Sequence, residues 1–283
     1  MPISIAMIYT RARWEEKAIL KEIEKRGLPV TPIKLTERFF DLANLGVEHD
    51  VYLQRTISYF AGLYSTAVLE AAGATVVNSY EVSAICGNKL LTTLKLIQHG
   101  VPTPRTAVAF SVEAALRAVE SLGYPSILKP IFGSWGRLVA PLNDPQSARA
   151  IFEDRAAMHP LYQIYYVQER VKRPPRDIRA FVIGDEVPAA IFRVSRGEEW
   201  RTNTSLGGKA IPCPVTDELR ELCLRAAEAV GGGVLGVDIM EDEEKGLVVH
   251  EVNHVVEFRN TVPVTGVNIP AYIVDYLVEV AKR

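Results

Sequence analysis

The chain has 283 residues, of which 48% are hydrophobic and 23% are charged, and its formal net charge is −2. This is the composition of an ordinary globular protein with room for roughly two or three small domains, and the small net charge excludes a global attraction to nucleic acid or to an anionic membrane. The three cysteines lack Cys-x-x-Cys spacing, and we see neither a signal peptide nor an apolar run of about 18 residues, so we expect a cytoplasmic protein without disulfides or structural zinc.

The first part of the chain alternates between strand patterns and helix patterns. The expected elements are a strand at 3–9, a helix at 14–26, a strand at 30–35, a helix at 63–72 and a strand at 75–77. Gly27 and Pro29 end the first helix. Such alternation is typical of a parallel sheet in an open α/β domain, which we assign to residues 1–92.

Two further units follow a helix at 89–99. The first, assigned to residues 93–162, combines strands and helices. The second, assigned to residues 163–283, is rich in strands, and the expected elements are strands at 165–171, 178–183, 187–194, 234–241 and 247–254 and helices at 217–230 and from Pro270. We therefore expect an α/β protein built of three α+β lobes.

Polar residues converge on the last predicted hairpin, whose strands flank a polar turn. If this turn is centred between Glu244 and Lys245, Asp238 lies opposite Glu251, and Asn253 projects from the same face. The other face is expected to hold Val237, Ile239, Val248, His250 and Val252. Opposed carboxylates repel unless a cation separates them, and hard oxygen ligands suit Mg²⁺. The hairpin thus predicts a magnesium site, with a solvated sheet face as the alternative.

A glycine-bearing loop follows the strand that ends at Lys129. The loop comprises Gly133, Ser134, Trp135, Gly136 and Arg137. Backbone N–H groups of such a loop can approach phosphate oxygens, and the lysine adds a positive charge. Because the loop joins two strands and is not a Walker A motif, an ordinary hairpin turn is the alternative. Lys89 is a second candidate for phosphate binding, or else a surface lysine.

Other polar positions lie where strands end. At Gln168, Glu169 and Val171 the chain leaves a strand, so backbone groups there could bind an adenine edge, or the site is a plain strand end. The polar loop from Asn203 to Gly208 could close over reactants.

Arginines add positive charge on two neighbouring strands. Arg179 and Arg193 lie close in the predicted pairing, together with Asp177. Cations near a glycine-bearing loop indicate anion recognition, with a solvated sheet face as the competing interpretation.

Taken in this order, the motifs resemble the ATP-grasp superfamily over essentially the whole chain, and within it the RimK-like branch. The matching positions are Lys89, Lys129-Pro130, Gly133–Arg137, Gln168-Glu169, Asp177–Arg179, Arg193, Asn203, Gly207-Gly208, Asp238 and Glu251–Asn253. The resemblance implies an ATP-grasp fold in which ATP is held between two antiparallel sheets.

The resemblance also implies roles for these residues. Adenine is expected at Gln168, Glu169 and the backbone near Val171, and the ribose at Asp177. Phosphates are expected at Lys89, Lys129 and the glycine-bearing loop. Mg²⁺ is expected at Asp238, Glu251 and Asn253. The catalytic residues are expected to be Arg179, Arg193 and Asn203, which would stabilise an acylphosphate and close the site.

Within this branch the chain is most similar to ligases that join α-aminoadipate to a small acidic amino-group carrier protein in lysine biosynthesis. The polar pair Asn260 and Thr261 implies aminoadipate, because its terminal carboxylate reaches deeper than that of glutamate and needs a donor. We expect a homo-oligomer, either a dimer or a tetramer. The alternatives are a glutamate-specific or dual-specificity ligase of arginine biosynthesis, a more distant ligase with the same ATP site, and a non-catalytic nucleotide-binding regulator.

Overall fold

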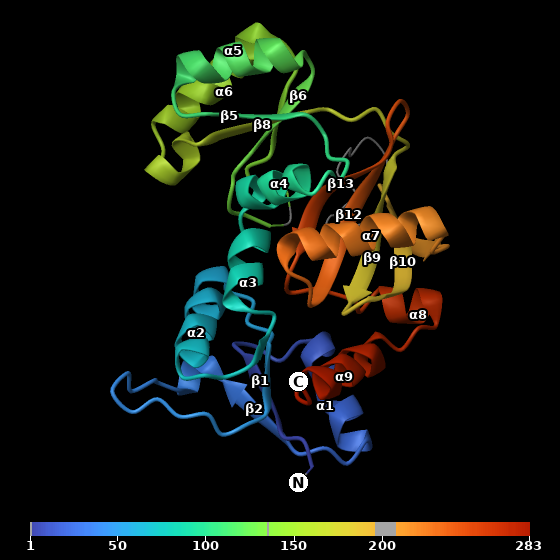
Figure 1. Cartoon of the computed structure of the whole chain (residues 1–283). Coiled ribbons are helices and arrows are strands. Elements are labelled where there is room, and N and C mark those ends of the chain that lie inside the picture. The colour runs from blue at the N-terminus through green and yellow to red at the C-terminus, as the bar shows by residue number, and fades with distance from the viewer. Residues whose placement is uncertain (1, 135, 196–207) are drawn as a thin grey trace.

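The computed structural model describes residues 2–134, 136–195 and 208–283. Its strands form three sheets, which belong to three successive parts of the chain. In Figure 1 the N-terminal sheet lies at the bottom, the second sheet at the top, and the third at the right. The predicted α/β class is confirmed. Within the described ranges, none of the helices combines the length and the apolarity that crossing a bilayer requires.

The N-terminal sheet has the strand order β2–β1–β3–β4, and all its strands run parallel. The strands are β1 (Ile5–Tyr9), β2 (Val30–Lys34), β3 (Val51–Gln54) and β4 (Val76–Val77). The other elements of this part are the helices α1 (Trp14–Lys25), α2 (Tyr59–Ala71) and α3 (Tyr80–Cys86) and the 3-10 turn η1 (Leu35–Glu37). The parallel arrangement is as predicted, but β3 is an additional strand. Its four residues are all buried, so it shows no alternating pattern.

The second sheet is antiparallel, with the order β5–β8–β6–β7. Its strands are β5 (Thr106–Ala109), β6 (Ser126–Lys129), β7 (Ala140–Leu142) and β8 (Tyr165–Glu169). Helices α5 (Val112–Leu122) and α6 (Pro145–Ala156) pack on it, and the 3-10 turn η2 (Pro160–Gln163) precedes β8. Ser111 caps α5 by accepting a hydrogen bond from the backbone N–H of Ala114. Helix α4 (Lys89–Gln98) leads into this lobe.

The third sheet is antiparallel and has five strands in the order β11–β10–β9–β12–β13. They are β9 (Arg176–Ile183), β10 (Glu186–Val194), β11 (Lys209–Cys213), β12 (Val234–Asp242) and β13 (Gly246–Asn253). Helix α7 (Asp217–Val230) covers one face and buries a large apolar cluster there. The other face carries polar side chains of β9, β10, β12 and β13, together with apolar residues where β9 ends and β12 begins.

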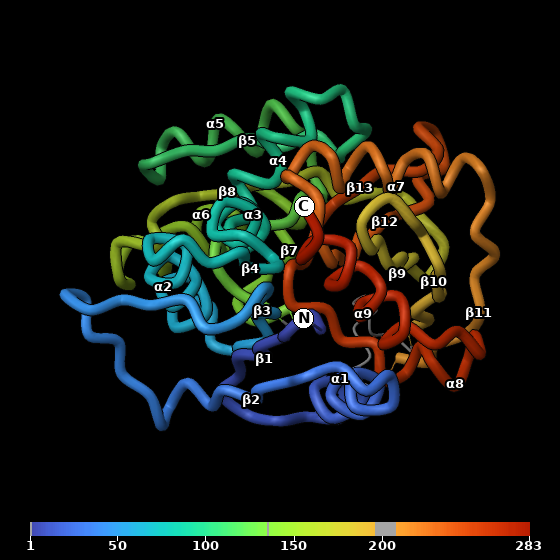
Figure 2. The backbone as a smooth tube through the Cα atoms, turned by 60° about the horizontal axis from the view of Figure 1, so that its bottom comes forward, coloured from blue at the N-terminus to red at the C-terminus, as the bar shows by residue number. Residues whose placement is uncertain are grey.

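The end of the chain returns to the N-terminal sheet. After the short helix α8 (Thr261–Thr265), helix α9 (Ile269–Val280) packs beside α1, and both Figure 1 and Figure 2 show the two helices together. Apolar residues of α9 join one buried cluster with β1, α1 and the ends of β9 and β12. This cluster therefore connects the N-terminal domain with the third sheet. The predicted boundaries of the three lobes remain a prediction.

Candidate functional site

The hairpin of β12 and β13 brings the predicted metal ligands together. Asp238 lies directly opposite Glu251, and Asn253 follows two residues later on β13. Asp242 pairs with Gly246, so the turn is centred on Glu244. A bulge beside Asp238 then shifts the register by one residue, which restores the expected pairing of Asp238 with Glu251. The prediction of the opposed carboxylates is confirmed, although the assumed turn centre is wrong by half a residue.

The bulge changes which side chains face the site. Val249 pairs with Ile239 and belongs to the apolar cluster under α7, whereas Val248 pairs with Met240 and shares the face of Asp238. The expectation that Val248 points away from the site is therefore wrong, because the extra residue of the bulge reverses the alternation along that strand.

His250 is likewise on the site side rather than the core side. Burial lowers its pKa well below the ordinary value, and the charge of Lys129 lowers it further, while Asp238 opposes both. Its two ring nitrogens are buried and have no hydrogen-bond partner among the described residues. We interpret His250 as a neutral side chain of the site. The sequence does not reveal its position there, since the bulge cannot be read from residue spacing.

Asp238 is the most heavily paired carboxylate of the site. Its side chain accepts hydrogen bonds from Nε and Nη2 of Arg179, the latter at 2.7 Å, and from Asn253 Nδ2 at 3.3 Å. Arg193 Nη2 lies 3.2 Å from Oδ1. Burial raises the pKa of Asp238, but the two arginines outweigh burial and hold it well below its usual range. The carboxylate is therefore ionised and saturated with donors.

Arg193 links this group to a second carboxylate. Its Nε and Nη2 lie 2.7 and 2.9 Å from the two carboxylate oxygens of Asp177, the residue opposite it on β9. Burial lowers the pKa of Arg193, whereas Asp238 and Asp177 raise it above the ordinary value. Two arginines and two aspartates thus form a paired, largely buried group, and the guanidinium groups are of the kind that also bind anionic reactants. The predicted ribose contact of Asp177 remains a prediction.

Two lysines from different elements reach the same place. Lys89, the first residue of α4, donates from Nζ to Glu251 Oε1 at 3.1 Å and to the carbonyl of Gly133 at 2.9 Å. Lys129, the last residue of β6, donates to Gln168 Oε1 at 2.6 Å. Burial lowers the pKa of Lys129 to about 8, against the attraction of Glu251. The lysines therefore lie between the second and third sheets, beside the carboxylates.

The glycine-bearing loop joins β6 to β7, as predicted. Gly136 has a φ of +67°, a left-handed conformation that favours glycine. Ser134 and Arg137 are exposed, and a backbone hydrogen bond of 3.3 Å joins Arg137 N–H to the Ser134 carbonyl. Trp135 lies outside the described residues. A loop of this kind beside two lysines suits phosphate oxygens.

The predicted adenine residues bind within the protein through their side chains. Gln168 is buried and, besides accepting from Lys129, donates to the hydroxyls of Thr106 and Tyr166 at 3.0 and 3.1 Å. Glu169 accepts from the backbone of Arg105 at 2.7 Å and from the ammonium group of Lys245. Their contacts with adenine remain predictions.

The two residues predicted to select the substrate lie at the start of α8. Asn260 is exposed, whereas Thr261 is buried with only 1% of its surface exposed. The six residues 254–259 connect them to the carboxylate hairpin. Asn203 lies outside the described residues, so the closure of the loop from Asn203 to Gly208 stays a prediction.

The donor set fits a divalent cation held jointly with a phosphate ligand. No group of three or more His, Cys, Asp and Glu side chains in the described ranges is arranged to hold a metal ion alone. Asp238 and Glu251 are two hard carboxylates on one face, and each is now neutralised by arginine or lysine. Mg²⁺ keeps few protein ligands and completes its shell with phosphate and water, so this sparse set suits it.

Two family models together match almost the whole chain. Residues 86–277 match the RimK-like ATP-grasp domain, and residues 5–85 match the LysX preATP-grasp domain. The α-aminoadipate–LysW ligase LysX of Sulfolobus acidocaldarius is 42% identical over 96% of this chain and 100% of its own length. The glutamate–LysW ligase ArgX of Sulfurisphaera tokodaii is 37% identical over 97% of this chain and 98% of its own length.

Solved structures agree on the fold. A RimK-domain ATP-grasp protein from Sphaerobacter thermophilus has a TM-score of 0.77 at 24% identity, covering 97% of this chain and 99% of that chain. The D-alanine–D-alanine ligase of Bacillus anthracis, solved with ATP, has a TM-score of 0.70 at 17% identity, covering 99% and 98%. At these identities the likeness shows the fold alone.

Proposed function

Because the chain belongs to the RimK-like ATP-grasp family, we propose that it is an ATP-dependent ligase that joins α-aminoadipate to an amino-group carrier protein. The bond would link the amino group of α-aminoadipate to the γ-carboxylate of the carrier's C-terminal glutamate. The observation that supports the chemistry is the face of β12 and β13, where Asp238 opposes Glu251 beside Lys89 and Lys129. Such a face can hold a nucleoside triphosphate and a divalent cation together.

The choice of substrate is supported by two separate observations. Three relatives named as α-aminoadipate–LysW ligases are 42, 40 and 38% identical to the chain over nearly its full length, compared with 37 and 36% for two relatives named as glutamate–LysW ligases. The polar pair Asn260 and Thr261 could donate hydrogen bonds to the distal carboxylate of α-aminoadipate. The glutamate ligase is the second candidate, because those relatives are almost as similar.

The reaction divides into two transfers. A carboxylate oxygen of the carrier attacks the γ-phosphorus of ATP, the bond to the bridging oxygen breaks, and ADP leaves. The amino group of α-aminoadipate then attacks the acyl carbon, phosphate leaves with its bonding electrons, and the nitrogen loses a proton. The products are an isopeptide, ADP and phosphate.

The residues of the site have separable roles in this scheme. Lys89 and Lys129 bind phosphate oxygens, and the backbone of the glycine-bearing loop covers them. Arg179 and Arg193 stabilise the acylphosphate and the substrate carboxylates, since a guanidinium group binds such oxygens in pairs. Asp238, Glu251 and Asn253 would hold Mg²⁺, which when bound would supply positive charge beside the phosphate oxygens.

An ADP-release assay tests the proposal. The purified chain is mixed with Mg²⁺, ATP and a carrier that ends in glutamate, and α-aminoadipate, glutamate or no amino acid is added. We expect ADP to form fastest with α-aminoadipate. Faster release with glutamate would favour the second candidate, and ATP binding without ADP release under any condition would favour a regulator. A cytoplasmic location and a dimeric or tetrameric assembly are part of the same proposal.

A further inference from the structure

The connecting segment, residues 254–259, runs from the carboxylate hairpin to Asn260 and Thr261. It leaves β13 after Asn253 and enters α8 at Thr261. It also passes beside the site, because Val256 and Arg179 both pack over Gly236 of β12, where an added Cβ would lie 2.9 Å from Val256 and 3.3 Å from Cδ of Arg179. A small displacement of the segment would therefore move both the predicted substrate residues and the surroundings of a predicted catalytic arginine.

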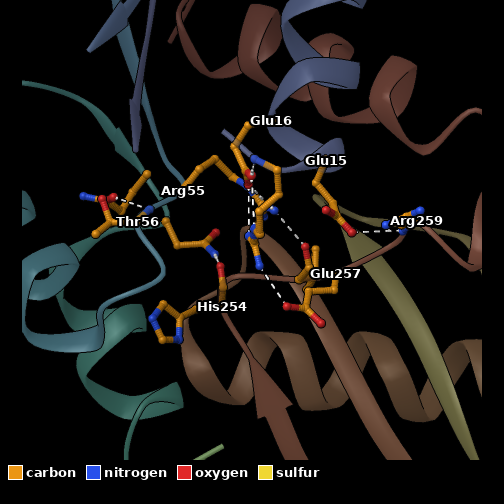
Figure 3. Close-up of polar contacts among 11 residues, drawn as sticks. Glu15, Glu16, Arg55, Thr56, His254, Glu257 and Arg259 are labelled. Atoms are coloured by element: carbon orange, nitrogen blue, oxygen red, sulfur yellow. Dashed lines mark hydrogen bonds and ion pairs between the residues drawn. The ribbon is translucent and has the colours of Figure 1, made fainter. Parts of the chain in front are cut away.

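Side chains of the N-terminal domain hold the backbone of this segment. Asn78 Nδ2 donates to the carbonyl of His254 at 2.7 Å, and Arg55 Nη2 donates to the carbonyl of Val256 at 2.9 Å. The backbone N–H of Arg259 donates to Glu15 Oε1 at 3.1 Å. Figure 3 shows Arg55 toward the left and Glu15 toward the right, so the two side chains reach different points of the segment. Because all three contacts are to main-chain atoms, they fix the path of the segment whatever its side chains are.

The holding groups are themselves buried and charged. Arg55 is 2% exposed and Glu16 is fully buried, and their side chains are joined by a hydrogen bond of 3.0 Å from Arg55 Nε. Arg13 donates to the same carboxylate of Glu16 and reaches Glu257 at 2.8 Å. A buried charge is unfavourable unless it is paired, so each member depends on the others for its position.

An apolar anchor completes the attachment. Phe258 is fully buried, with its ring 6.0 Å from the ring of Trp14 and 6.0 Å from the guanidinium carbon of Arg55. The next residue, Arg259, is the one whose N–H binds Glu15. The last fixed point of the segment therefore lies directly before Asn260.

We propose that Glu15 and Arg55 are positioning residues for the acceptor amino acid. They bind main-chain groups of the connecting segment, fix its backbone and thereby place Asn260 and Thr261 at the acceptor. This inference rests on the proposed function, because it assigns the two residues to the acceptor rather than to ATP. A purely structural attachment of the N-terminal domain would affect stability and both substrates alike.

The test compares two substitutions of the same residue. Glu15→Ala removes the acceptor of the Arg259 N–H, whereas Glu15→Gln removes the charge and keeps an acceptor oxygen. We expect Glu15→Ala to raise the KM for the amino acid about tenfold, as loss of one part-buried hydrogen bond does, with the KM for ATP within about twofold of wild type. Glu15→Gln should restore the wild-type KM to within about threefold. Glu24→Ala, an exposed acidic position on the same helix, is the matched control.

A second variant addresses the arginine. Arg55→Lys keeps the positive charge beside Glu16, but one ammonium group cannot match the planar fork that reaches both Glu16 and Val256. We expect the same selective rise in the KM for the amino acid. An unchanged KM in both Glu15→Ala and Arg55→Lys, or an equal rise for ATP and amino acid, would overturn the inference.

Amide hydrogen exchange separates this inference from the proposed function. In Glu15→Ala the exchange of residues 256–261 should accelerate, while that of β12 and β13 should stay at the wild-type rate. If the wild-type chain turned over no amino acid, the proposed function would fail, yet selective exchange would still support the positioning of the segment. Unchanged exchange in an active enzyme would refute the positioning alone.

Discussion

Lys129 provides the sharpest prediction, because its chemistry depends on a charge held in a buried place. Burial lowers its pKa from the ordinary 10.5 to about 8. This difference corresponds to about 3 kcal/mol against the charged form. Bound phosphate oxygens would favour the charged form again, so ATP binding should be accompanied by proton uptake by Lys129 as the pH rises above about 8.

The consequence is a defined dependence of ATP affinity on pH. Below pH 8 the lysine is already protonated, and the Kd for ATP should be nearly constant. Above pH 8 the Kd should rise, approaching about tenfold for each pH unit, because the protein must first bind a proton. Lys129→Met should weaken binding at neutral pH and abolish this rise, while Lys21→Met, at an exposed position on α1, should leave it intact.

Isothermal titration calorimetry from about pH 7 to about pH 9.5, in buffers of different ionisation enthalpy, measures both Kd and proton uptake. An equal rise of Kd in Lys129→Met and wild type would show that Lys129 is not the group that binds the proton. The free energy of unfolding should also depend on pH through Lys129. Since the folded pKa is depressed, the unfolded chain binds more protons between about pH 8 and 10.5, and the free energy of unfolding should increase across that window in wild type but not in Lys129→Met.

Three further predictions concern the site and the connecting segment beside it. Glu251→Gln keeps an oxygen near Lys89 but removes one negative charge, so the Mg²⁺ concentration for half-maximal turnover should rise about tenfold, and an unchanged requirement would exclude this residue as a ligand. Asn260→Gly with Thr261→Phe should shift the ratio of kcat/KM toward glutamate by about tenfold or more, measured with both amino acids on one carrier, and Thr261 is buried enough that about 1–3 kcal/mol of stability should also be lost. Phe258→Ala should lower the free energy of unfolding in urea by about 3–5 kcal/mol, because its ring is fully buried, and a loss below about 1 kcal/mol would contradict its role as an anchor.

The carboxylate hairpin shows what residue spacing can predict and what it cannot. The opposition of Asp238 and Glu251 was predicted from antiparallel pairing about an assumed turn centre, and it holds because the bulge offsets the half-residue error in that centre. The bulge was not, since an extra residue in a strand leaves no trace in the spacing. That one irregularity accounts for the wrong side assigned to Val248 and for the unexpected place of His250.

Long-range contacts explain the other differences. Glu15 and Arg55 lie in the N-terminal part, more than two hundred residues from the main-chain groups they bind at Arg259 and Val256. In the sequence Glu15 is one of several acidic residues of an ordinary helix. Because its partner is a main-chain N–H group, no residue of opposite charge marks the contact in the sequence. The order of the ATP-site motifs, in contrast, was informative, because Lys129 and Gln168-Glu169 lie at the ends of predictable strands and Lys89 opens a predictable helix.

The most direct test of the account is the mass of the carrier after reaction. Intact-protein mass spectrometry of a glutamate-terminated carrier, incubated with the chain, ATP, Mg²⁺ and equal amounts of α-aminoadipate and glutamate, shows which acceptor has been joined. We predict that the carrier gains the mass of α-aminoadipate less one water, with one ADP formed for each bond. A carrier that gains glutamate instead, or ADP formation without any gain in carrier mass, would contradict the proposed function.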